Sequence, residues 1–138
     1  MILEGENLFQ KKNYSAAESV FNKYMEIHGK DEIVSRALAK TLEASGRTDE
    51  AIDLYAEIIN SCMSCGTRAD PFLKRRYAEL CFKNKDTSSS LVDIYLDLAR
   101  EDPDNRAHYF SRVSALLHSR GEFDEAKRYE ALAKKLQP

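Results

Sequence analysis

The sequence predicts an all-α protein, an α-α superhelix of about eight antiparallel helices. Apolar residues recur at helical spacing along the 138 residues, and no stretch shows the alternation typical of a strand. The same pattern repeats at intervals of roughly 34–40 residues, within the range of helical repeat proteins. With only 5 Gly and 3 Pro, few residues interrupt the helices.

The repeated unit contains an apolar pair four positions apart. In three units a small or aliphatic residue precedes an aromatic one, and the turn SGRTDEAIDLY at 45–55 returns as SRGEFDEAKRY at 119–129. Because the aromatic residues recur with the repeat, we expect them in the core rather than on a surface that stacks nucleic-acid bases. The pairs are Ala17/Phe21, Ala51/Tyr55 and Leu91/Tyr95.

Each unit is predicted to contain two helices. Gly46 breaks the apolar pattern between the helices of the second unit. Asp70 and Pro71 are a capping residue followed by proline at the first helical position, and Asp102 and Pro103 separate the third and fourth units in the same way. The predicted helices span residues 2–11, 14–28, 31–45, 48–63, 71–84, 88–101, 104–119 and 122–136.

At these residues the chain resembles a tetratricopeptide repeat array along essentially its whole length. The phrases GRTDEAIDLY and GEFDEAKRY are close to the family pattern, and Pro103 and Pro138 fall where its repeats end. The third unit departs from the pattern, since Glu79 replaces a small residue and Lys85 stands where two other units have glycine. We expect one repeat domain over 1–138, as part of a longer protein. Its units span residues 1–29, 31–64, 70–102 and 104–138.

Composition excludes several broad classes. The 21 Lys and Arg against 23 Asp and Glu give a net charge of -2, without the basic excess of a DNA-wrapping protein. No apolar run approaches the ~18 residues that a membrane span needs. The N-terminus lacks the pattern of a secretory signal. The 3 cysteines are too few for a disulfide framework, so we expect reduced thiols and a cytoplasmic protein.

No constellation in the sequence indicates catalysis. Cys62 and Cys65 have the spacing of half a zinc site, but no histidine lies at the spacing of the other half. Cys81 lies among apolar residues and is interpreted as a small core residue. The histidines form no i, i+4 pair, and there is no glycine-rich phosphate loop. We therefore expect a protein that is not an enzyme and uses no cofactor or metal.

The resemblance also implies where a partner binds. In such arrays the first helix of each unit lines a concave groove, and here that first-helix face is rich in Arg and Lys, which favours an acidic ligand. Tyr77, Leu73 and Leu80 are expected to hold an apolar side chain beside the cations. The expected groove residues are Arg36, Lys40, Leu73, Arg76, Tyr77, Leu80, Lys83, Asn84, His108 and Arg112.

The resulting hypothesis is a non-enzymatic protein-protein interaction module, a scaffold or adaptor that binds an acidic or amphipathic peptide or partner segment in this groove. Self-assembly into a homo-oligomer is the alternative, because the last predicted helix still shows Leu132, Ala133 and Leu136 with nothing after it.

Two minor alternatives remain. Some relatives grip an acidic chaperone tail with a clamp of Lys, Asn and Arg, but only Arg112 matches that clamp outright. RNA-binding helical repeats usually have basic grooves, whereas this chain is slightly acidic. We expect neither a nucleic acid nor a membrane as partner.

Overall fold

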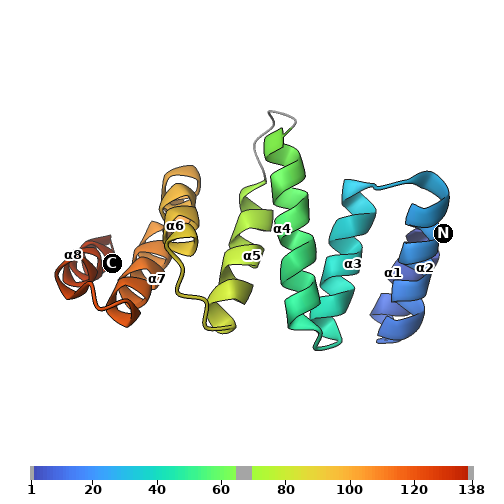
Figure 1. Cartoon of the computed structure of the whole chain (residues 1–138), viewed down its shortest axis with the longest axis horizontal. Helices are drawn as coiled ribbons and strands as arrows, with labels where there is room; N and C mark the ends of the chain where they lie inside the picture. The colour runs from blue at the N-terminus through green and yellow to red at the C-terminus, as the bar shows by residue number, and fades with distance from the viewer. Residues whose placement is uncertain (1, 65–69, 137–138) are drawn as a thin grey trace. The chain divides into compact units, whose positions relative to one another are not determined.

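The computed structural model describes residues 2–64 and 70–136, apart from the side chains of residues 2 and 62–64. Over these residues the chain is all-α, with eight α-helices, one short 3-10 helix and no strand (Figure 1). The predicted class is therefore confirmed, and every predicted helix is present with ends that differ by no more than two residues. The largest difference arises because Pro103–Asn105 forms the 3-10 helix η1, so the seventh helix begins at Arg106.

The chain divides into two compact units, Met1–Arg68 and Ala69–Pro138. Within each unit, every helix packs against the next one along the chain. The four helix pairs lie inside the four repeat units expected from the sequence. Unit 1 contains α1 (Ile2–Gln10), α2 (Tyr14–His28), α3 (Glu32–Ala44) and α4 (Thr48–Ser64). Unit 2 contains α5 (Pro71–Lys83), α6 (Ser89–Glu101), η1, α7 (Arg106–Ser119) and α8 (Phe123–Leu136).

The turn inside each helix pair has the same backbone geometry. Lys12, Gly46, Lys85 and Gly121 occupy the same place in the four turns, and all four have positive φ, from 62° to 86°. In each turn the N–H of the next residue donates to a carbonyl five positions earlier in the preceding helix, at 2.9–3.0 Å. This closure satisfies a carbonyl that the helix end would otherwise leave without a partner. The four donor–acceptor pairs are Asn13–Leu8, Arg47–Leu42, Asp86–Cys81 and Glu122–Leu117.

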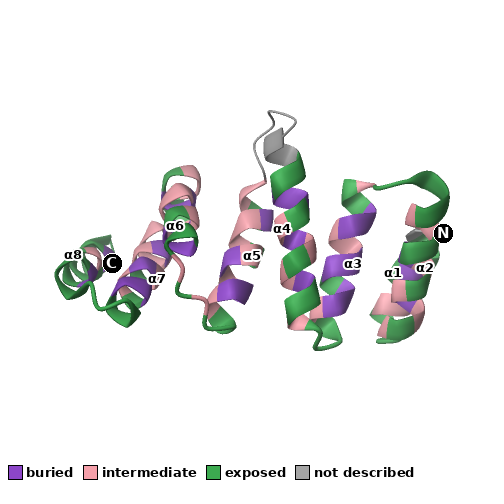
Figure 2. Cartoon of the chain, viewed as in Figure 1, coloured by how far each residue is buried: buried purple, intermediate pink, exposed green. Residues whose placement is uncertain are grey.

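The repeated apolar pairs form the core of each unit (Figure 2). None of the six side chains in the pairs Ala17/Phe21, Ala51/Tyr55 and Leu91/Tyr95 is more than 2% exposed, which confirms the prediction that they are core residues. In unit 1, a Cβ at Gly5 would lie 2.5 Å from the Phe21 ring, so only glycine lets α1 approach α2 this closely.

The four turns predict opposite effects of exchanging glycine and lysine. The left-handed conformation costs a residue with a side chain about 1–2 kcal/mol, partly offset by the greater unfolded-state freedom of glycine. Lys85→Gly should therefore raise the free energy of unfolding by about 0.5–1 kcal/mol. Gly121→Lys should lower it by a similar amount. Urea unfolding of both variants beside the unaltered chain checks this, and changes of the same sign would contradict the account of the turns.

Candidate functional site

The ten residues of the expected first-helix face lie in both units. Arg36 and Lys40 are on α3 of unit 1, and the other eight belong to α5, its C-terminal cap and α7 of unit 2. The structure corrects the expected role of Leu73 and Leu80. Their side chains are only 2% and 7% exposed, so they fill the core of unit 2 and offer no surface to a ligand.

A cluster around Glu79 occupies the first-helix face of unit 2. The Glu79 carboxylate on α5 accepts hydrogen bonds from the Nε of Arg112 and from the hydroxyl of Tyr95, each at 3.1 Å. The Nε2 of His108 also contacts this carboxylate. The Arg112 guanidinium lies 4.2 Å above the ring of Phe82. His108 and Arg112 are thus brought together as expected, but by an acid of the same unit, so the charge of Arg112 is already paired within the fold.

Burial and hydrogen bonding act in opposite directions on Glu79. Burial alone raises the pKa of its carboxyl, but the hydrogen bond from His108 and the charge of Arg112 outweigh burial and hold the pKa below its ordinary value. For Tyr95, burial and then the Glu79 charge raise the pKa, so the hydroxyl stays protonated and donates. The cluster therefore joins α5, α6 and α7 through one ionised carboxylate.

Several other polar side chains of the first-helix face also have partners. Arg36, Arg76, Tyr77 and Asn84 each interact with another group of the protein. Lys40, Arg76 and Lys83 are exposed, whereas Arg36 and Tyr77 are half-buried. Many of the polar side chains assigned to this face from the sequence therefore already interact with other groups of the protein.

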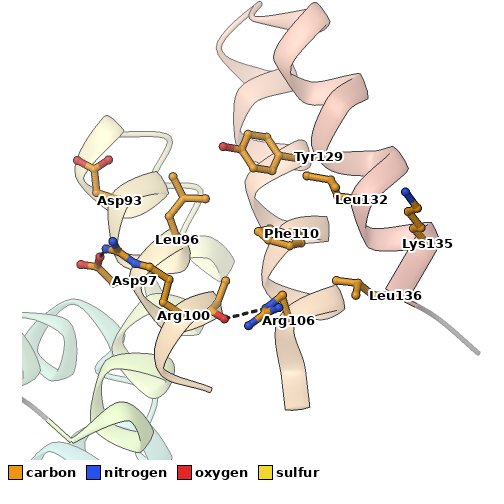
Figure 3. Close-up of a pocket in the computed structure, with 11 residues that line it drawn as sticks. Asp93, Leu96, Asp97, Arg100, Arg106, Phe110, Tyr129, Leu132, Lys135 and Leu136 are labelled. Carbon is orange, nitrogen blue, oxygen red and sulfur yellow. Dashed lines mark hydrogen bonds and ion pairs between the residues drawn. The ribbon is translucent and has the colours of Figure 1, made fainter. Parts of the chain in front are cut away.

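Unit 2 has an open groove of about 760 Å³ elsewhere, lined by α6, α7 and α8 (Figure 3). Phe110 of α7 lies between Leu96 of α6 on one side and Tyr129 and Leu132 of α8 on the other, and its ring centroid is 5.7 Å from that of Tyr129. The volume falls within the roughly 300–1,000 Å³ typical of ligand pockets. The lining of this α6–α8 groove is Asp93, Leu96, Asp97, Ala99, Arg100, Arg106, Phe110, Tyr129, Leu132, Lys135 and Leu136.

The connection between α6 and α7 positions one end of the groove. The carboxylate of Asp102 accepts from the Tyr109 hydroxyl at 2.6 Å and from the Asn105 amide at 2.8 Å. These two hydrogen bonds, that from Tyr109 first, lower the pKa of Asp102. The Nε of Arg106, at the start of α7, donates to the carbonyl of Ala99 at 3.1 Å, which fixes the stem of Arg106 at the groove.

The charged groups of the groove are divided between its walls. The α6 wall carries Asp93 and the intrahelical ion pair of Asp97 with Arg100, the α8 wall carries Lys135, and Arg106 of α7 adds a cation at one end. Asp93 and Lys135 are both exposed, and Figure 3 places them on opposite sides of the apolar floor. A ligand in the groove would therefore meet negative charge on one flank and positive charge on the other.

Sequence reasoning missed this groove, although one signal was present. Leu132 and Leu136 stood out as apolar residues on the last helix, and they are 38% and 47% exposed. The matching positions of α4, 75 residues earlier, are the polar Glu57 and Ser61, so the repeat itself does not require leucine there. The floor also needs Phe110 from another helix, which only the packing of α7 brings to the same place.

The cysteine predictions have separate outcomes. Cys81 is 3% exposed, which confirms it as a core residue, and burial raises the pKa of its thiol against an opposing hydrogen bond with Tyr77. Cys65 and the side chain of Cys62 lie outside the described residues. In the part of the chain that the structure describes, no group of three or more His, Cys, Asp or Glu side chains is placed to hold a metal ion. No described helix has the length and apolar character needed to cross a membrane.

Comparison with protein-family models gives no match, and comparison with curated proteins gives none either. The tetratricopeptide resemblance therefore stays a prediction from the sequence.

The Glu79 cluster predicts a pH-dependent contribution to stability. Since folding lowers the pKa of Glu79, its contribution is present above the ordinary value of 4.5 and is lost as the pH falls through the folded-state pKa. Glu79→Gln should cost about 1–3 kcal/mol of unfolding free energy at pH 7, and this difference should shrink between pH 5 and pH 3.

Urea unfolding across this pH range measures the difference. Glu122→Gln is the matched control. The Glu122 side chain is half-exposed and its carboxylate lies 3.5 Å from the Nε of Arg120, a long and solvent-screened contact. Its loss should lower the free energy of unfolding by less than about 1 kcal/mol. A Glu79→Gln cost that stays constant into acid would contradict the pKa argument.

Proposed function

We propose that this protein is a non-enzymatic protein-protein interaction module that binds a segment of a partner protein in the α6–α8 groove. The observation that carries the proposal is the composition of that groove. Its apolar floor of Leu96, Phe110 and Leu132 is partly open to solvent, and charged side chains border it. Interfaces that bind protein segments combine an apolar centre with a polar rim in this way.

The partner segment has an apolar face with charged residues beside it, as the groove chemistry requires. An amphipathic ligand was also expected from the sequence, but on the first-helix face and not in the α6–α8 groove. The first-helix face of unit 2 is a secondary candidate for acidic ligands, supported by the exposed Arg76 and Lys83.

We regard the four helix pairs as tetratricopeptide-like repeats of a superhelical array, on the strength of the recurring turn geometry and the buried apolar pairs. A scaffold or adaptor in the cytoplasm fits this reading, and the thiol of Cys81 is compatible with a reducing compartment.

A selection experiment tests the proposed function. Random 16-residue peptides displayed on phage are enriched on the whole chain and then tested against two variants of α8. Leu132→Asp places a charge on the groove floor, whereas Ala131→Asp places one at an exposed neighbour that does not line the groove. Enriched peptides should lose at least about 10-fold in affinity on Leu132→Asp and little on Ala131→Asp.

Two results would contradict the proposal. Failure to enrich any peptide that depends on Leu132 would remove the groove as a binding site. The second contradicting result would come from light scattering at two concentrations of the protein. A dimer of the unaltered chain that Leu132→Asp converts to monomer would show that a second copy occupies the groove, in favour of self-assembly.

A further inference from the structure

We infer that the segment bound in the α6–α8 groove is an amphipathic α-helix that presents a basic residue to the α6 wall and an acidic residue to the α8 wall. This inference rests on the proposed function and specifies the partner's chemistry. It follows from which backbone hydrogen-bonding groups and which charges of a ligand the groove can pair.

The walls and floor of the groove are helices, whose backbone groups bond within each helix. An extended peptide exposes an N–H and a C=O at every residue, and α6, α7 and α8 offer no free strand edge to pair with them. Over the side chains of Leu96, Phe110 and Leu132, each buried peptide group without a partner would cost about 1–3 kcal/mol.

A helical ligand avoids this cost, because its backbone hydrogen bonds are internal. One face of such a helix, with apolar residues at i, i+3, i+4 and i+7, can cover the floor while its other face stays in water. The groove is open, so only that face has to enter. Leu132 and Leu136 lie one helical turn apart on α8 and extend the apolar surface along the groove.

The charges of the two walls add specificity. On the α6 wall, Asp97 is paired with Arg100, which leaves Asp93 as the acid that faces a ligand. On the α8 wall, Lys135 lines the groove, while its neighbour Lys134 does not and lies near Glu130. A helix with Lys or Arg on one flank and Asp or Glu on the other complements both walls at once.

Proline substitution in the selected peptides tests the helical conformation. Central proline breaks a helix, whereas proline at its first position is tolerated, so the two substitutions form a matched pair. Fluorescence anisotropy with the whole chain measures the affinity of the peptides whose binding depends on Leu132. Central proline should lower that affinity by at least about 10-fold, and proline at the first position by less than about 2-fold. Tolerance of central proline would overturn the helical conformation and leave the proposed function standing.

Charge reversal tests the flanks. Lys135→Glu should weaken the same peptides by about 2–5-fold, and Lys134→Glu should leave their affinity unchanged. Replacing the acidic flank residue of the peptide by Lys should restore binding to Lys135→Glu. Asp93→Lys should likewise lower the affinity, and replacing the basic flank residue of the peptide by Glu should restore it. Equal losses on Lys134→Glu, or no restoration, would overturn the assignment of charges. Absence of any peptide that depends on Leu132 would instead count against the proposed function.

Discussion

In unit 2, Tyr95 of α6 links α5 and α7. Its buried ring lies beside that of Tyr109, with centroids 6.2 Å apart, and its hydroxyl donates to Glu79 on α5. Glu79 also accepts from His108 and Arg112 on α7, so one carboxylate joins three helices. The α6–α8 groove depends on this arrangement, because α6 and α7 supply Leu96 and Phe110 to its floor.

The use of polar groups differs between the two candidate surfaces. On the first-helix face of unit 2, His108 and Arg112 are held by an acid of their own unit, and a ligand would have to compete with Glu79 for them. In the α6–α8 groove, Asp93 and Lys135 border apolar side chains that remain partly open to solvent. Apolar surface that folding leaves uncovered supplies binding free energy without first breaking an interaction.

The sequence predicted the fold far better than the site, for a physical reason. Helix ends, turns and the buried pair Ala17 and Phe21 depend on residues close together in the sequence. The same residue types recur in each repeat, so the pattern of one repeat supports the prediction for the next. The groove depends on Phe110 and Leu132, which are 22 residues apart and meet only when α7 packs against α8. Glu79 departs from the small residue expected at its position, and its partners lie 16, 29 and 33 residues further along the chain.

We propose the α6–α8 groove as the ligand surface of this protein. Amide chemical-shift mapping by NMR, with the whole chain and the tightest selected peptide, tests it most directly. The largest shifts should fall around Leu96, Phe110 and Leu132. Shifts concentrated around Arg76 and Lys83, with the groove unchanged, would contradict it and return the binding site to the first-helix face of unit 2.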